Sequence, residues 1–275
     1  MARRAGGVNT RGDMLRHICV AYDDDERAGW GLEVARDLAR RASARLTIAH
    51  VVPPVDEAVD IREELLIELA GLREDVRWRH RLKALAATVR DVETHVHVLP
   101  GRVSFQLLEL LHQERPDLVV AGTRALRGVQ RSLAPRLRHA LLAQAPCPVM
   151  LVRTPPAPDR QPVVLFCGRT ATANRSVAAA RAFAASLRWQ LVRCRAPAHG
   201  RDAATLNAVL AACREHRPGF AVIAGERCHG LRSRLGTSGT AALIDAAPCP
   251  VLVLSPAGRQ APIVRASRRR APSAV

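Results

Sequence analysis

Ala145-Pro146-Cys147-Pro148-Val149 is a stretch that returns, residue for residue, as Ala247-Pro248-Cys249-Pro250-Val251. A second pair of matching segments lies upstream, because 115–122 and 217–225 both begin with Arg-Pro and end in an apolar run followed by Ala-Gly. Both pairs are displaced by 102 or 103 residues. A shared displacement of this kind is typical of two copies of one structural unit in a single chain.

Short apolar runs alternate with segments of helical periodicity throughout the first copy. The first run, 18–22, leads into three consecutive aspartates and then into apolar residues at helical spacing between 32 and 39. Strands that alternate with helices favour right-handed crossovers and a parallel sheet. The predicted strands are 18–22, 46–52, 94–98, 118–121 and 148–152, and the later predicted helices are 58–90, 103–114 and 131–144.

The second copy is predicted to be an abridged version of the first. Its first strand lies 144 residues after its counterpart, whereas its last strand lies only 102 residues after. About 42 residues, equivalent to the middle helix and the third strand, are therefore missing from it. Its predicted strands are 163–167, 190–194, 220–224 and 250–254, and its predicted helices are 174–187, 203–216 and 238–246.

Charge is concentrated at the two ends of the chain, which has a formal net charge of +17. Residues 1–16 carry four arginines and one aspartate, and residues 259–275 carry five arginines and no acid. This pattern predicts that both ends are solvated, flexible basic arms. The alternative interpretation is that they dock electrostatically onto nucleic acid or an acidic partner. The predicted organisation is a basic arm at 1–14, a first domain at 15–153, a proline-rich linker at 154–161, a second domain at 162–256 and a basic tail at 257–275.

Composition places the chain among folded proteins without a membrane span. The 275 residues are 48% hydrophobic and 24% charged, as in ordinary globular domains. No run approaches 18 consecutive apolar residues, and the basic start leads into no apolar signal segment. We therefore expect a cytoplasmic protein.

Seven cysteines are present, but they form no Cys-x-x-Cys pair and no cluster with metal-ligand spacing. We expect most of them to be small buried apolar residues, with no metal site. Cys228, which precedes His229 in a glycine-rich segment, could be a reactive thiol or an idle one.

The residues quoted above resemble the universal stress protein family in its tandem two-domain form. The resemblance is carried by Asp23 at the end of the first strand, Val51-Val52 after the second, Gly122 after the fourth, and the Ala-Pro-Cys-Pro-Val ending. It covers about 15–153, and the second copy extends it to about 255. It implies two tandem α/β sandwiches, each with a parallel sheet between helices.

Nucleotide-binding members of that family hold ATP at the carboxyl ends of the strands, where open α/β sheets generally bind ligands. There an aspartate that ends the first strand contacts the adenine side, a backbone valine follows the second strand, and G-x2-G-x9-G-[S/T] wraps the phosphates. By this resemblance Asp23 matches the aspartate, Val51 or Val52 the valine, and Gly122 the first glycine.

The rest of the phosphate motif has changed in the first copy. Its second glycine falls on Ala125, its third on Pro135 and its Ser/Thr on Arg136. Proline at 135 removes an N–H group that a phosphate would need. Gly128 adds freedom to the loop, and two interpretations stay open: a weakened or lost ATP site, or a retained site in which arginines supply the charge. The arginines are Arg124, Arg127, Arg131 and Arg136.

In the second copy, Cys167 holds the aspartate position, and the phosphate segment runs from Gly225 through Cys228 to Gly236-Thr237-Ser238. A glycine, two hydroxyls and a following helix N-terminus could form an anion cradle. The alternative is an ordinary cap of the last helix.

The sequence thus favours a stress-response or regulatory protein with a degenerate ATP pocket in the first domain. The alternative is an interaction module that binds no nucleotide and whose basic tails dock onto nucleic acid or an acidic protein. No catalytic motif is found, and His50, His95 and His97 read as structural imidazoles, so we expect no enzyme beyond weak ATP-linked activity.

Family members commonly pair domains through the last strand. The resemblance therefore implies an intramolecular pseudo-dimer in which 149–152 lies beside 251–254, or else a homodimer.

Overall fold

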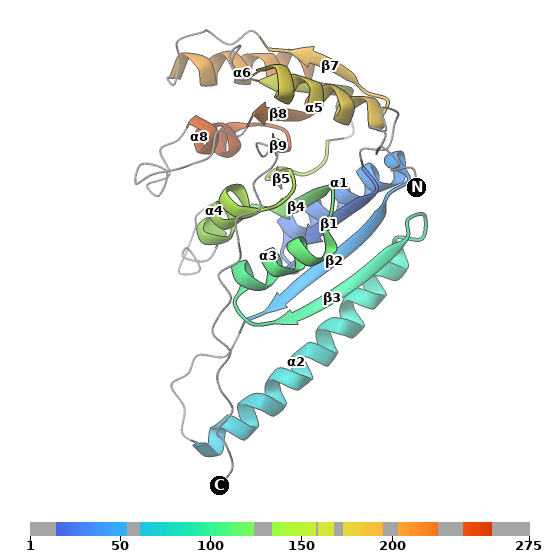
Figure 1. Ribbon diagram of the computed structural model, residues 1–275, viewed down its shortest axis with the longest axis vertical. Coiled ribbons are helices and arrows are strands. Elements are labelled where there is room, and N and C mark those ends of the chain that lie inside the picture. Colours follow the sequence, from blue (N-terminus) through green and yellow to red (C-terminus); the bar gives the residue numbers. More distant parts are fainter. Residues whose placement is uncertain are drawn as a thin grey trace, which may run out of the picture.

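The computed structural model describes residues 15–53, 61–123, 134–157, 159–167, 173–194, 203–224 and 239–254. In this part of the chain nine strands form one sheet, in the order β3-β2-β1-β4-β5-β9-β8-β6-β7 (Figure 1). The strands are β1 (His17–Ala21), β2 (Arg45–Val52), β3 (Thr94–Pro100), β4 (Leu118–Gly122), β5 (Val149–Val152), β6 (Gln161–Cys167), β7 (Gln190–Arg193), β8 (Pro218–Ala224) and β9 (Val251–Leu254). All neighbours are parallel except β5 and β9, which are antiparallel.

Helices cover both faces of this sheet. The alternation of side chains along each strand sends Ile18 and Val20 of β1 to one face and Cys19 to the other, so two apolar cores form. One core includes residues of α1 (Glu26–Ala42), α2 (Ile61–Thr88) and α5 (Ala173–Ser186). The other includes residues of α3 (Val103–Glu114), α4 (Ala134–Gln144), α6 (Ala203–His216) and α8 (Gly239–Ala246). The α/β class predicted from the sequence is confirmed.

The two copies meet through their last strands, as the resemblance implied. Met150 lies opposite Leu252, Val149 opposite Val253, and Leu151 opposite Val251, so the register is symmetric about the central pair. An ion pair of 2.7 Å between Arg138 of α4 and Asp245 of α8 joins the halves beside these strands. The halves therefore form one continuous sheet around an approximate twofold axis.

The abridgement of the second copy is also confirmed. The first half has the strand order β3-β2-β1-β4-β5 and the second β7-β6-β8-β9, so β6 corresponds to β1 and β8 to β4. Among the described residues, α6 alone connects β7 to β8, where the first half has α2, β3 and α3. The domain boundaries themselves stay a prediction, because the sheet runs through both halves without a break.

Element boundaries agree with the sequence analysis to within a few residues. Three strands are two residues longer than expected: β3 extends over Thr94–Pro100, β6 over Gln161–Cys167 and β8 over Pro218–Ala224. Residues 58–60 and 131–133 of two predicted helices lie outside the described part. None of the helices in the described part combines the length and apolar character needed to cross a membrane.

Candidate functional site

Three consecutive aspartates turn the chain from β1 into α1. The N–H group of Tyr22 donates to Ala49 O at 2.8 Å and extends the β1–β2 pairing by one residue. Asp24 then adopts φ 63°, and Asp25 caps α1 by accepting a 2.7 Å hydrogen bond from the N–H of Ala28. Asp23, between Tyr22 and Asp24, is exposed at the carboxyl edge of the sheet, where the sequence analysis placed it.

Asp24 anchors α2 to this turn. Its carboxylate pairs with Arg81 of α2 and accepts a 3.1 Å hydrogen bond from Tyr22 Oη. The pKa of Tyr22 is raised to about 12, first by burial and then by this hydrogen bond to Asp24. The sequence analysis missed this contact, because Arg81 lies in a long helix with no motif of its own.

His50 is a structural imidazole, as predicted. Its Nδ1 donates to Tyr22 O at 2.7 Å, and its ring stacks on Trp78 of α2 with 3.5 Å between centroids and 20° between planes. Burial is the main cause that lowers its pKa. His95 and His97 contact Glu93 at 2.9 Å and Glu114 at 3.9 Å respectively.

The two valines at the end of β2 have different environments. Val52 O accepts a 2.9 Å hydrogen bond from the N–H of Gly101, so its carbonyl belongs to the β2–β3 connection. The backbone N–H and C=O groups of odd-numbered residues of β2 point toward β1 instead. The last backbone hydrogen bond between β1 and β2 is the one that Ala49 O accepts from the N–H of Tyr22. The peptide groups of Val51 therefore point past the end of β1, on the side where Asp23 lies. Of the two candidates, Val51 is the better placed for a ligand.

Gly122 has a packing reason to be glycine. A Cβ at this position would lie 2.5 Å from Arg27 O and 2.8 Å from Ala28 N, in the first turn of α1. The sequence analysis assigned this glycine to close approach of a phosphate, but the contact of α1 with β4 requires it whether or not a ligand binds.

Thr123 follows Gly122 and carries a buried hydroxyl. Its N–H donates to Val152 O at 2.9 Å, the residue is 8% exposed, and its Oγ1 has no hydrogen-bond partner among the described residues. Buried polar atoms are nearly always paired in native proteins. This orphaned hydroxyl lies on the strand that ends beside Asp23, and no sequence motif pointed to it.

Most of the phosphate motif lies outside the described residues. This applies to Arg124, Gly128, Gly225, Gly236, Thr237 and Ser238, and also to Cys228 and His229. Arg136 and Pro135 lie in the first turn of α4, where Pro135 is the second residue. The roles assigned to all of them stay predictions.

A groove of about 340 Å³ lies between α1 and the C-terminal end of α2. The sequence analysis did not predict it, because its two sides come from helices far apart in the sequence. Residues of α1 at positions 26, 29, 30, 32, 33 and 36 form one side, Leu85, Thr88 and Val89 the other, and Tyr22 one end.

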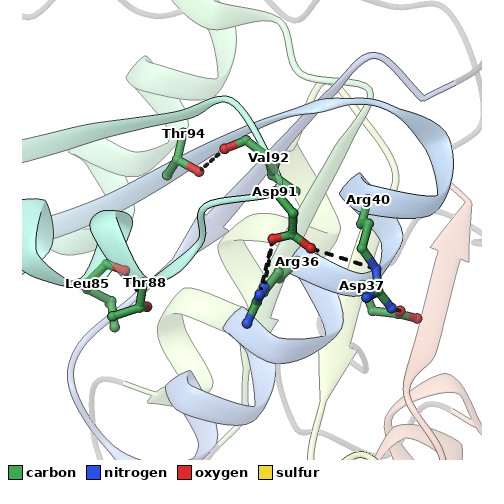
Figure 2. A network of polar contacts seen from close by, with 8 residues as sticks. All are labelled: Arg36, Asp37, Arg40, Leu85, Thr88, Asp91, Val92 and Thr94. Carbon is green, nitrogen blue, oxygen red and sulfur yellow. Dashed lines mark hydrogen bonds and ion pairs between the residues drawn. The ribbon is translucent and has the colours of Figure 1, made fainter.

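An ion-pair network joins the two helices beside this groove (Figure 2). Arg36 of α1 contacts Asp91, in the turn after α2, through Nη2 at 3.1 Å and Nε at 3.3 Å. Arg40 adds a 3.9 Å contact to the same carboxylate. The pKa of Asp91 is lowered first by a hydrogen bond from its own backbone N–H and then by Arg36.

Four of the described cysteines, Cys19, Cys147, Cys213 and Cys249, are buried, as predicted, and Cys194 is half-buried. Burial raises the pKa of Cys147 to about 12, so it stays a thiol at neutral pH. Among the described residues no group of histidine, cysteine and acidic side chains could hold a metal ion.

Comparison with known proteins agrees with this arrangement. Residues 14–153 match the model of the universal stress protein family. A universal stress protein of Thermus aquaticus is 32% identical over 140 residues, which are 51% of this chain and 100% of that protein.

Two solved structures resemble the chain over both halves. A universal stress protein from Archaeoglobus fulgidus has a TM-score of 0.66 at 15% identity and covers 89% of this chain and 98% of its own. A protein of unknown function from Pseudomonas aeruginosa has a TM-score of 0.56 at 17% identity and covers 87% of this chain and 92% of its own. At these identities the likeness shows the fold alone, and that fold extends across the tandem arrangement.

Proposed function

The chain belongs to the universal stress protein family, and from that premise we propose that it is a stress-response regulator that binds an adenine nucleotide weakly at the carboxyl ends of β1, β2 and β4. The proposal assigns the adenosine side to Asp23, the peptide groups of Val51 and the hydroxyl of Thr123. It assigns no catalytic step to these residues.

The observation that carries the proposal is the buried hydroxyl of Thr123 at this edge, which has no hydrogen-bond partner among the described residues. Asp23 is exposed, Val51 lies past the β1 ladder, and Thr123 keeps a buried hydroxyl without a partner among the described residues. An acceptor, a peptide group and a hydroxyl match the mixed donors and acceptors of an adenosine. A bound nucleoside that paired with Thr123 Oγ1 would remove the cost of leaving this group unsatisfied.

The phosphate side supports weak binding. The first turn of a helix binds anions through its free N–H groups, and Pro135 removes one of them from the first turn of α4. Gly122 is committed to its contact with Arg27, so it supplies less freedom there than the sequence suggests. We therefore expect the triphosphate to add little to the affinity for the nucleoside.

The test begins with acid-quenching the freshly purified full chain and identifying any released nucleotide. Thermal stability is then followed while ATP or adenosine is added to the nucleotide-free protein. A ligand at about 100 times its dissociation constant stabilises the folded state by about 2.7 kcal/mol, a shift of several degrees. We expect similar shifts with both ligands, abolished by Asp23→Ala and retained by Glu215→Ala, which removes an exposed carboxylate in the second half.

Restoring the missing donor tests the phosphate side separately. Pro135→Ala returns one N–H group to the first turn of α4, and a hydrogen bond from it to a phosphate is worth about 1.5–3 kcal/mol. We expect this variant to bind ATP about tenfold or more tightly and adenosine unchanged.

No shift with either ligand at millimolar concentration would reject the nucleotide proposal and favour the interaction module of the sequence analysis. A strong, salt-sensitive preference for ATP in the unmodified chain would instead support the retained site in which arginines bind the phosphates.

A further inference from the structure

The groove between α1 and α2 plays no part in the adenosine site proposed above. It opens on the α1–α2 side of the sheet, and its lining includes two aromatic rings, Tyr22 and Trp30, and two carboxylates, Glu26 and Glu33. Arg36 also lines it, but its guanidinium is paired with Asp91. Both rings are half-buried and both carboxylates are exposed. The groove therefore combines apolar surface with negative charge on one helix face.

Gly29 lines the same groove and has no packing reason to be glycine. Glycine inside a helix is unfavourable relative to alanine, and α1 contains two. At Gly31 a Cβ would lie 3.3 Å from Gly122 N, so close packing accounts for that residue. At Gly29 a Cβ would meet nothing within 4 Å. Gly29 therefore leaves the helix backbone uncovered on the α1 side of the groove, and a ligand can approach it closely.

The two carboxylates carry unpaired negative charge on a strongly basic protein. Neither Glu26 nor Glu33 has an ion-pair partner among the described residues, while the whole chain has a net charge of +17. Most of the surface therefore repels a cationic ligand, and these two acids attract one. Glu26 and Glu33 are seven positions apart, which is about 10.5 Å along the helix axis.

That spacing matches an extended peptide. In a polyproline II segment, side chains three residues apart lie on the same side and about 9.3 Å apart. Two cationic side chains at that spacing can each reach one glutamate. The Trp30 ring already has the guanidinium of Arg27 at 5.9 Å from its centroid, so this ring is a surface that cations can approach.

Ion pairs between α1 and the turn after α2 support the groove. Figure 2 shows Arg36 and Arg40 of α1 directed at the same Asp91 carboxylate, which fixes the distance between α1 and the end of α2. Contacts that hold the two sides of a groove in position reduce the cost of ordering the site when a ligand binds.

We propose that the α1–α2 groove docks an extended segment of a partner protein that carries two arginines or lysines three residues apart. The cations pair with Glu26 and Glu33, and an intervening small or proline residue lies over Gly29 against Trp30.

The experiment uses the full chain and an acetylated nonapeptide, Ala-Pro-Ala-Arg-Pro-Ala-Arg-Pro-Ala, in a calorimetric titration at low salt. A peptide with both arginines replaced by neutral citrulline is the ligand control. We expect the arginine peptide to bind, and the Glu26→Gln, Glu33→Gln double variant or the citrulline peptide to weaken binding about tenfold, since two exposed ion pairs are lost. Gly29→Ala should weaken binding about threefold while the melting temperature does not fall.

Glu215→Gln, which removes the same kind of charge from α6 in the second half, is the matched control and should leave binding unchanged. The proposal is overturned if the arginine peptide does not bind, or if Glu215→Gln weakens binding as much as the double variant does. It is also overturned if the peptide binds only a chain that lacks residues 257–275, because the groove would then belong to this protein's own basic tail.

Discussion

The three consecutive aspartates that follow β1 have different structural roles. Asp25 caps α1, Asp24 binds Arg81, and Asp23 is exposed at the edge of the sheet. Glycines differ in the same way, because Gly122 is enclosed by the backbone of Arg27 and Ala28 whereas Gly29 faces open space. Residue type alone does not separate these roles; the atoms that surround each residue in the fold do.

The two glycines predict opposite responses to alanine. Gly122→Ala forces a Cβ against Arg27 O and should destabilise the protein by about 1–3 kcal/mol, because backbone has to move. Gly29→Ala removes a flexible residue from a helix and should stabilise it by about 0.5–1 kcal/mol. Urea unfolding of both variants checks the prediction, and equal effects of the two substitutions would contradict the packing described for Gly122.

Two buried histidines predict how stability depends on pH. The pKa values of His17 and His50 are lowered from 6.5, in both cases first by burial. His17 contacts Thr47 and Arg45, near Glu114 and Asp117; His50 contacts Tyr22 and Trp78, near Asp24, Glu74 and Arg81. Burial therefore favours the neutral form of both imidazoles in the folded protein.

Since the unfolded chain takes up these protons first, the free energy of unfolding should fall as the pH drops below about 6.5. The stability that the neutral rings contribute is fully present above that pH and is lost down to the lowered folded-state pKa. Urea midpoints measured between about pH 7 and pH 5 test this, and His50→Gln should reduce the slope. A midpoint that rises on acidification in this range, with no change of slope in the variant, would contradict the assignment.

At the scale of elements, the C-terminal half of α2 is anchored to the sheet and to the turn after β1. Leu82 is fully buried, Trp78 stacks on His50, and Arg81 reaches Asp24 while lying 5.4 Å from the Trp78 ring. The helix thus closes over the ends of β1 and β2, and one side of the groove depends on the same contacts. The second half has no equivalent helix in its described part.

Trp78→Ala should destabilise the protein by about 2 kcal/mol, because the indole is half-buried and its stacking on His50 is lost. Hydrogen exchange should become faster in α2 and in the turn at Asp24, and stay unchanged in α6. Trp78→Phe, which keeps an aromatic ring, should recover about half of the loss. Equal exchange rates in the alanine variant and the unmodified chain would show that α2 is anchored elsewhere.

At the scale of the molecule, the antiparallel pairing of β5 with β9 makes one folding unit of two copies. Each of the two apolar cores contains residues from both halves, such as Met150 and Leu252 in one and Leu151 and Val251 in the other. Arg41 of α1 also lies 5.4 Å from the Trp189 ring of the second half. The halves share buried surface and should not unfold separately.

Fluorescence can test this, because Trp30 and Trp78 report on the first half and Trp189 on the second. We expect a variant that keeps Trp189 alone and a variant that keeps the other two to show the same urea midpoint and slope, as in a two-state transition. Two separated transitions would show that the shared cores contribute little coupling.

The sequence determined the fold because it repeats its own pattern. Two copies of Ala-Pro-Cys-Pro-Val, apolar runs of strand length and their unequal spacing predicted a tandem parallel sheet and the loss of one strand and helix. The pairing of the last strands was implied by the family resemblance alone. The resemblance pointed to Asp23 and to Val51 or Val52 as candidate site residues, at the edge where the carboxyl ends of parallel strands meet.

The tertiary structure decided what depends on segments far apart in the chain. It alone showed that Gly122 serves the contact with α1, that the Thr123 hydroxyl is buried without a partner in the described part, and that Arg81 binds Asp24. The groove between α1 and α2 likewise has sides more than 40 residues apart. Periodicity records which face of an element is buried, but it contains no information on which distant atom lies opposite, and these features depend on such distances.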